Sequence, residues 1–455
     1  MNAPIFIEKN KIYRFNIAKN EIVVTEKCPS KKKIILGIII DTDLDIPPKT
    51  GVTYRLYYLS KRLTEKGLGV KIFLCNRNIK IAEDAKKLFS KSNIEFHIVP
   101  QQIFYNPTAM ELLISRNLVT ILQVEDSVSL LRYHSIATNL GIPICLEMHD
   151  VEATLQEKLG FKNADIKLSK AIAYFAASLS SKTICMTEVD KKELINRIGV
   201  EANKIFVIPN PIDLREFPHF GPNRKTKNIL FIGNMFYWPN QNAAKFILKK
   251  LHPALTKKIA GVHFTLAGMI PENLIEIIKN KRNIFATGST NRLNNFLKDG
   301  TIGICPVTEG SGMKVKILNY CATGLPIITT SIGAMGYENI KSLIIENDLE
   351  KYSKLIAALF NDKKKLVLLG KKNREYVKEY YDIEKISKAI IGIYKDIVAS
   401  HLTPKISKNI KNHFKLPLPL WLKEKRVKKF LNDQYYIIKN EKILYSGKIP
   451  ENTHR

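Results

Sequence analysis

The sequence lacks the features that mark several special classes of protein. No two of its six cysteines form a Cys-x-x-Cys pair, and most have apolar neighbours, which argues against a zinc site and against a disulfide framework. No run of about 18 apolar residues occurs, and the first residues do not join a basic stretch to an apolar one, so neither a membrane span nor a secretion signal is predicted. The thiols are expected to be buried in a reducing compartment, and the chain is expected to be cytoplasmic. The six are Cys28, Cys75, Cys145, Cys185, Cys305 and Cys321.

Acidic residues are also scarce relative to basic ones. The chain has 72 Lys and Arg against 42 Asp and Glu, a formal net charge of +30. Such a surface attracts polyanions and acidic lipid faces. No nucleic-acid recognition module accompanies the charge, so nucleic acid is not expected as a partner. With 455 residues, 45% of them hydrophobic, the chain is long enough for two or three globular domains.

Short apolar, β-branched runs alternate with longer amphipathic stretches in two successive sets. The first set comprises residues 32–40, 70–76, 94–100, 119–125, 142–149, 183–188 and 205–211, with helical patterns at 52–66 and 168–180. The second comprises residues 228–234, 262–268, 283–289, 301–307, 325–331 and 342–347. This rhythm predicts an α/β protein of two Rossmann-like, doubly wound parallel-sheet domains that face each other across a cleft. The expected parts are an N-terminal extension (1–30), an N-terminal Rossmann-like domain (31–210), a C-terminal Rossmann-like domain (211–385), and a C-terminal helix with a basic extension (386–455).

The two ends of the chain differ from the rest. Residues 1–28 and 433–448 carry β-like runs around a Lys-Asn turn, a pattern typical of a hairpin. Residues 405–431 mix Lys with apolar residues and include the short basic helix candidate LWLKEKRVKKFL. That helix either docks on the protein or contacts an anionic membrane surface, which would make the protein peripheral at the cytoplasmic face.

The most informative segment is residues 309–338, which read EGSGMKVKILNYCATGLPIITTSIGAMGYE. Gly310 and Gly312 follow an expected strand and precede an expected helix that ends at Gly324. Backbone N–H groups at such a helix N-terminus form a binding site for phosphate.

Lys314 and Lys316 would add positive charge at this site. Fixed ammonium groups can stabilise a departing diphosphate without a divalent cation, so no metal is expected. Two residues apart on a helix, the side chains would diverge by about 200°. We therefore predict Lys316 as the diphosphate contact, with Lys314 in the loop or exposed.

Residues 309–338 resemble the C-terminal signature of the group 1 retaining glycosyltransferases of the GT-B fold, especially members that read G-S-G-x-R-x-K-x-L-E. The resemblance covers roughly residues 33–395 and includes GNMFYWPNQNAAKF and VIPNPID. It implies transfer of a sugar from a nucleotide-diphosphate sugar to a glycan or lipid-linked acceptor, of the hexosyltransferase type. It also implies retention of the anomeric configuration, with no cofactor.

The resemblance also implies roles for residues of the C-terminal half. Glu309 stands where an acidic residue contacts the donor sugar, or it is a solvated loop residue. Asn319 stands where a second acidic residue is expected to hold the ribose hydroxyls, and Asn forms a weaker bond there. Asn234 either approaches the diphosphate or shapes its turn. Gly288 opens the loop to Arg292 that would hold the nucleobase.

In the N-terminal half, His149 ends an expected strand at the cleft, where the resembling enzymes keep a histidine near the donor sugar. Its alternative is a structural histidine with satisfied hydrogen bonds. Asp150 would orient the acceptor, or Asp150 and Glu152 would be an N-cap and first-turn acid. Glu125 would bind the acceptor or be an ordinary rim residue. Gly51 would let the backbone approach a ligand, or serve a tight turn.

Two other functions remain open on the sequence alone. Because Asn319 replaces the expected acid, a catalytically inactive scaffold or partner protein is one alternative. A GT-B sugar-nucleotide epimerase is the other.

Overall fold

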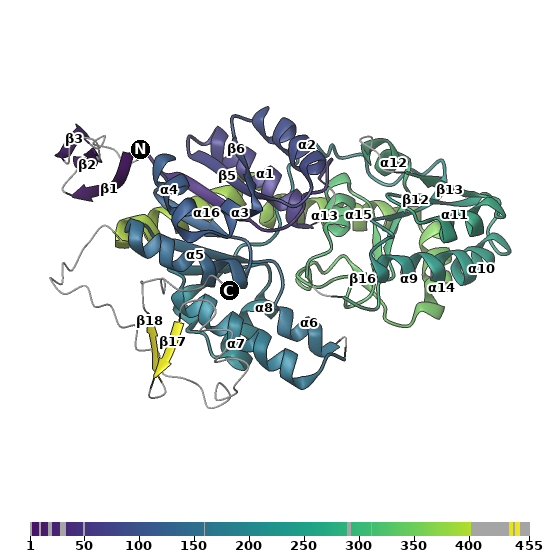
Figure 1. Ribbon diagram of the computed structural model, residues 1–455. Coiled ribbons are helices and arrows are strands. Elements are labelled where there is room, and N and C mark those ends of the chain that lie inside the picture. The colour runs from purple at the N-terminus through teal and green to yellow at the C-terminus, as the bar shows by residue number, and fades with distance from the viewer. Residues whose placement is uncertain are drawn as a thin grey trace.

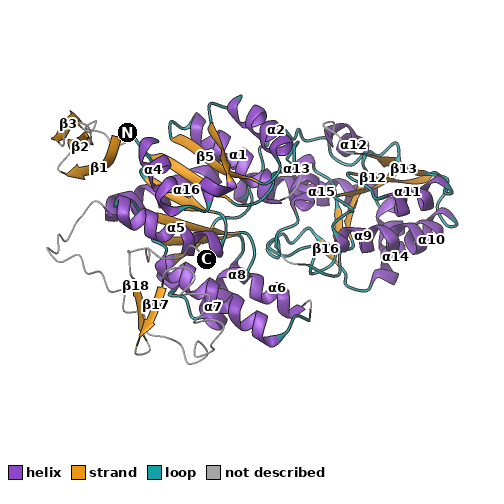
Figure 2. Ribbon diagram, in the orientation of Figure 1, coloured by secondary structure: helices purple, strands orange, loops and turns teal. Residues whose placement is uncertain are grey.

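A computed structural model was obtained for the chain. It describes residues 2–8, 11–16, 21–27, 33–48, 51–158, 160–288, 293–310, 312–401, 436–439 and 442–445, with side chains in the part from 33 to 401 except residue 158. Two lobes lie side by side, each with a sheet at its centre and helices around it (Figures 1 and 2).

The N-terminal lobe is built on a seven-stranded sheet in the order β10-β9-β8-β7-β4-β5-β6. All neighbouring strands are parallel. The inner strand β4 reads ILGIII and is almost fully buried, because helices cover both faces of such a sheet. The strands are β4 (Ile35–Ile40), β5 (Gly69–Asn76), β6 (Glu95–Pro100), β7 (Ile121–Val124), β8 (Ile144–Met148), β9 (Lys182–Cys185) and β10 (Ile205–Val207).

The ends of the helices in this lobe carry residues that favour starting or stopping a helix. Asp126 accepts a hydrogen bond from the Ser129 N–H at 2.7 Å and so starts α5, which Gly141 ends in the left-handed conformation. The helices are α1 (Gly51–Glu65), α2 (Ile79–Ser90), α3 (Gln101–Phe104), α4 (Pro107–Arg116), α5 (Ser127–Leu140), α6 (Glu152–Lys158), α7 (Asn163–Leu179) and α8 (Glu188–Glu193). A π-helical turn (Leu194–Ile198) and a 3-10 turn (Ala202–Lys204) follow.

The C-terminal lobe repeats this architecture with a six-stranded parallel sheet in the order β13-β12-β11-β14-β15-β16. The strands are β11 (Lys227–Ile232), β12 (Val262–Ala267), β13 (Ile284–Thr287), β14 (Ile302–Cys305), β15 (Ile327–Thr329) and β16 (Ile344–Ile345). The helices are α9 (Trp238–Phe246), α10 (His252–Thr256), α11 (Glu272–Lys279), α12 (Leu293–Asp299), α13 (Val315–Thr323), α14 (Tyr352–Asn361) and α15 (Lys363–Tyr380). A π-helical turn (Ile247–Leu251) joins α9 to α10, and a 3-10 turn (Leu349–Lys351) precedes α14.

Both sheets therefore have the doubly wound order predicted from the sequence. In each, the chain runs outward from a central strand and then returns to the strand's other side, between β4 and β7 in one lobe and between β11 and β14 in the other. Sheets of this kind bind ligands outside the carboxyl ends of the strands at that reversal.

The chain passes between the lobes at two places that touch each other. Ile212 N–H donates to the Tyr381 carbonyl at 2.8 Å, and Ile383 N–H donates to the Ile212 carbonyl at 3.0 Å. After the second passage, helix α16 (Ile383–His401) returns to the N-terminal lobe and packs on α1. The ion pair between Lys66 and Glu384 (2.9 Å) adds to this contact.

Near the ends of the chain, the predicted hairpin over residues 1–28 is part of a larger sheet. β1 (Asn2–Glu8) pairs with β2 (Lys11–Asn16), and β3 (Glu21–Lys27) adds a third antiparallel strand, because Glu21–Lys27 is a further β-branched run. β17 (Tyr436–Lys439) and β18 (Lys442–Tyr445) form the other predicted antiparallel pair. The basic segment 405–431 lies outside the described residues.

Candidate functional site

The loop between β14 and α13 has the backbone that its glycines predict. Gly310 and Gly312 have φ values of 106° and 68°, a region that residues with a Cβ rarely adopt. A Cβ at Gly312 would lie 2.5 Å from Oδ1 of Asp150, a residue of the opposite lobe. The glycine therefore permits a close approach between the two halves of the molecule.

Helix α13 begins directly after this loop. Lys314 is the residue before the helix, and its Nζ donates to the Gly312 carbonyl at 2.8 Å. Lys316 is in the first helical turn and its side chain is buried. The helix thus begins between the two lysines, and they point to different surroundings.

The Lys316 ammonium is buried without a carboxylate partner among the described residues. Its Nζ donates to Asn240 Oδ1 at 2.7 Å and lies 4.3 Å from the centre of the Phe231 ring. Burial, together with the charge of Lys314, lowers its pKa to about 8. A buried ammonium without a carboxylate partner is stabilised by an anion, and a helix N-terminus such as that of α13 also favours negative charge.

Asn240 is a site residue that the sequence did not single out. Its side-chain N–H donates to the Asn234 carbonyl at 2.9 Å while its oxygen accepts from Lys316. Gly233 lies against both groups, since a Cβ there would be 3.0 Å from Lys316 Nζ. The signal in the sequence for Asn240 was its place in the first turn of α9, the helix that follows Gly233 and Asn234.

The other donor-side residues are placed as follows. Asn234 accepts a hydrogen bond from the Phe236 N–H at 3.0 Å, so its side chain shapes the turn. Glu309 is exposed in the loop before α13. Asn319 is buried on α13, and within the described part of the chain its Oδ1 has no hydrogen-bond partner. Gly288 follows β13 in open surroundings, and residues 289–292 of the expected nucleobase loop lie outside the described residues.

On the opposite lobe, Gly51 is the first residue of α1. A Cβ there would lie 3.9 Å from the Val315 side chain at the start of α13. The N-terminal ends of α1 and α13 therefore meet across the space between the lobes. Glu152 lies in the first turn of α6, whereas Asp150 precedes that helix by two residues.

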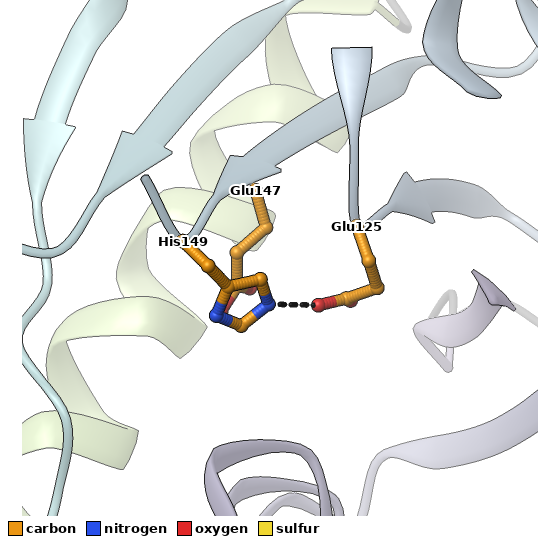
Figure 3. A group of neighbouring side chains, drawn as sticks. All are labelled: Glu125, Glu147 and His149. Carbon is orange, nitrogen blue, oxygen red and sulfur yellow. Dashed lines mark hydrogen bonds and ion pairs between the residues drawn. The ribbon is translucent and has the colours of Figure 1, made fainter. Parts of the chain in front are cut away.

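His149 directly follows β8, and its imidazole points at the Glu125 carboxylate from the end of the neighbouring strand β7 (Figure 3). Nε2 of His149 lies 2.8 Å from Oε2 of Glu125. Burial lowers the pKa of His149, but the hydrogen bond to Glu125 and the charges of Glu125 and Glu147 outweigh it, so the net shift is upward. Burial and the charge of Glu147 raise the pKa of Glu125.

The predicted acceptor residue Glu125 is therefore buried rather than at an open rim. Gln123 donates its side-chain N–H groups to Glu125 Oε1 at 2.8 Å and to Glu147 Oε2 at 2.7 Å. Arg55 binds the other oxygen of Glu147, and Tyr394 of α16 donates to Gln123 Oε1.

Glu125, Glu147 and His149 offer ligand atoms that lie within 4.8 Å of one another. These atoms do not fit a resident cation, because Arg55 places a guanidinium on Glu147 and Gln123 directs N–H groups at both carboxylates. The cluster is thus a hydrogen-bonded polar network, in which Nη2 of Arg55 is a buried atom without a hydrogen-bond partner among the described residues.

The chain matches two families of protein domain, one in each lobe. Residues 49–216 match Glycosyltransferase Family 4, and residues 226–362 match Glycosyl transferases group 1. The chain belongs to the group 1 glycosyltransferases. It has their GT-B fold, as the sequence resemblance implied.

Two relatives of this glycosyltransferase are themselves named as sugar transferases. The chain is 25% identical, over 61% of its length, to 77% of UDP-Gal:alpha-D-GlcNAc-diphosphoundecaprenol alpha-1,3-galactosyltransferase from Escherichia coli. It is 21% identical, over 78% of its length, to 82% of the phosphatidylinositol N-acetylglucosaminyltransferase GPI3 subunit from Saccharomyces cerevisiae.

Solved structures share the fold of this glycosyltransferase. The Anabaena protein HepE in complex with UDP and glucose superposes with a TM-score of 0.62 at 12% identity, covering 79% of this chain and 99% of that chain. A glycosyltransferase from Rickettsia africae superposes with a TM-score of 0.61 at 17% identity, covering 80% and 99%.

Two further expectations can be compared with the described part of this glycosyltransferase. The five cysteines in the described part of the chain are buried and unpaired, as predicted. In that same part, no helix is long and apolar enough to cross a membrane.

Proposed function

We propose that this glycosyltransferase moves a hexose from a UDP-sugar to a lipid-linked or glycan acceptor, with retention and without a metal. The observation that carries the proposal is Lys316, a buried ammonium without a carboxylate partner among the described residues, at the N-terminus of a helix. A diphosphate is the ligand that would neutralise it. The E. coli relative's UDP-Gal donor and the UDP complex of HepE support uridine as the nucleoside.

In the proposed reaction, the bond between the sugar C1 and the β-phosphate oxygen breaks, and its electron pair leaves with UDP. The acceptor hydroxyl oxygen forms the new bond to C1 on the same face, and its proton passes to the departing phosphate oxygen. Lys316 and the N–H groups of α13 stabilise the charge that develops on the diphosphate. Retention and the sugar contacts of His149 and Glu309 rest on the family resemblance.

The donor and acceptor sides would meet between the lobes. Asp150 approaches the glycine loop and Gly51 faces the start of α13, which supports roles for both residues near the proposed diphosphate. The acceptor class is supported by the names of the relatives, which act on a diphosphoundecaprenol-linked sugar or on phosphatidylinositol.

A transfer assay tests this function. Purified protein with EDTA is given UDP-galactose or UDP-N-acetylglucosamine and a GlcNAc-diphospholipid acceptor, and the product anomer is determined by NMR. Transfer with an α-anomeric product and no loss in EDTA supports the proposal. A β-product contradicts retention, and loss of activity in EDTA that Mg²⁺ restores contradicts metal independence.

Lys316→Ala should lower the transfer rate, whereas Lys249→Ala, which removes an exposed lysine of the same lobe, should not. Tight UDP binding without transfer to any acceptor would instead support the scaffold function that Asn319 leaves open. Interconversion of the free UDP-sugar would support an epimerase.

We also propose that the protein is cytoplasmic and binds the membrane peripherally through residues 405–431. Its basic and apolar composition supports this. Sedimentation with vesicles that contain anionic lipid should fall when the lysines of 405–431 are replaced by glutamine, and unchanged sedimentation would contradict the proposal.

A further inference from the structure

The polar network that contacts His149 through Glu125 leads to a second proposal, which rests on the proposed function. His149 has two ring nitrogens, and Glu125 occupies Nε2 at 2.8 Å (Figure 3). Only Nδ1 is then available to a ligand. In neutral histidine with Nε2 protonated, Nδ1 accepts a hydrogen bond, whereas in protonated histidine it donates one.

Glu125 is itself held in place from the other side. Its second oxygen accepts an N–H of Gln123 at 2.8 Å. The Gln123 amide cannot turn round, because its oxygen accepts from Tyr394 and its nitrogen also binds Glu147. The orientation of Glu125 is therefore fixed by Gln123 of β7, which Glu147 of β8 and Tyr394 of α16 hold in turn.

Charge balance fixes a proton on the Glu125 and His149 pair. Two buried carboxylates, Glu125 and Glu147, face one permanent cation, Arg55, which binds Glu147. A second buried carboxylate without a cation would be costly. Burial therefore favours the form of the pair that keeps one proton, which agrees with the raised pKa of both groups.

The same network reaches both passages between the lobes. Arg55 Nη1 donates to the Pro209 carbonyl at 2.7 Å, just before the first passage, and Tyr394 belongs to α16, which follows the second. The network thus joins the imidazole to the segments around which the lobes are connected.

We propose that Glu125 is the positioning residue of His149, which it orients so that Nδ1 faces the donor sugar as a hydrogen-bond donor during transfer. Glu125 does not touch the substrate. Carboxylate–histidine pairs act in this way in other sites, where the carboxylate fixes the tautomer and supports the charged ring.

Histidine-labelled protein without substrate gives the first test. The resonance absent from His149→Asn identifies His149, and its titration is followed by NMR in the wild type, in Glu125→Gln and in Glu188→Gln. Glu188 is an exposed carboxylate at the same edge of the sheet. The pKa of His149 should fall in Glu125→Gln and stay at its wild-type value in Glu188→Gln. An unchanged pKa in Glu125→Gln overturns the proposal.

The wild type alone gives a second test, should Glu125→Gln fail to fold. The ¹⁵N shifts of His149 above its pKa should show Nε2–H, the tautomer that donates to Glu125. The Nδ1–H tautomer would contradict the arrangement.

The transfer rate then distinguishes a positioning role of Glu125 from a purely structural one. In Glu125→Gln, kcat should fall about 10–100-fold, and the alkaline limb of its pH profile should move to lower pH. The Kd for UDP should keep its wild-type value, because the diphosphate site is on the other lobe. A parallel loss of UDP binding would indicate a structural role. Absence of transfer in the wild type would refute the proposed function, whereas the NMR titration would still decide the role of Glu125.

Discussion

At the scale of single residues, the protonation of Lys316 is expected to control donor affinity. Its pKa of about 8 lies below that of an ordinary lysine because the ammonium is buried. A diphosphate favours the charged form, so its affinity is full below this pKa and is lost as the pH rises through it.

The Kd for UDP should therefore rise by up to about tenfold per pH unit above pH 8 in the wild type. Calorimetric titrations between pH 6 and pH 10 measure this slope. In Lys316→Met, the affinity should be lower and the slope should vanish. An equal slope in both proteins would assign the titration to another group.

Asn319 gives a second prediction at this scale. Its buried Oδ1 has no hydrogen-bond partner among the described residues, and a ribose hydroxyl would donate to it. Asn319→Leu should weaken UDP binding about tenfold, the loss of one to two hydrogen bonds, while inorganic diphosphate binds as it does to the wild type. If both ligands lose affinity equally, Asn319 does not bind the ribose.

At the scale of elements, the loop before α13 depends on the backbone of Gly312. Alanine there would have to adopt a φ near 68° and approach Asp150. Gly141 has a similar φ of 60°, and a Cβ there would have nothing within 4 Å, so Gly141→Ala carries the backbone strain without the contact.

Gly312→Ala should reduce transfer about tenfold or more, because displacement of the loop moves the α13 N-terminus. Gly141→Ala should lower thermal stability with little effect on turnover. Similar kinetic losses in the two variants would show that strain alone matters.

The elements were largely predictable from the sequence. Continuous apolar runs such as ILGIII indicated both parallel sheets, and the glycines before α13 indicated the phosphate site. The hydrogen bond of Asn240 to Lys316 was not predictable, since the residues lie 76 positions apart. Likewise, Glu125 was predicted to bind the acceptor or lie at the rim, because its burial depends on how helices distant in the sequence pack.

At the scale of the whole molecule, α16 joins the end of the described C-terminal lobe to the core of the other lobe. Tyr394 donates the hydrogen bond that fixes Gln123, and both side chains are buried. Tyr394→Phe should therefore lower the free energy of unfolding by about 1–3 kcal/mol. Urea denaturation measures this, with Tyr380→Phe, an exposed tyrosine on α15, as the control. Equal stability of the two variants would show that the network does not secure α16.

The central claim is a metal-free UDP site formed by the α13 N-terminus and Lys316. The most direct measurement is calorimetric titration with UDP and with GDP in EDTA, on the wild type, Lys316→Ala and Lys249→Ala. We predict that UDP binds the wild type and Lys249→Ala with equal affinity, that GDP binds more weakly, and that Lys316→Ala loses about 2–3 kcal/mol of binding free energy. UDP affinity that is equal in all three proteins, or absent from the wild type in EDTA, would contradict the account.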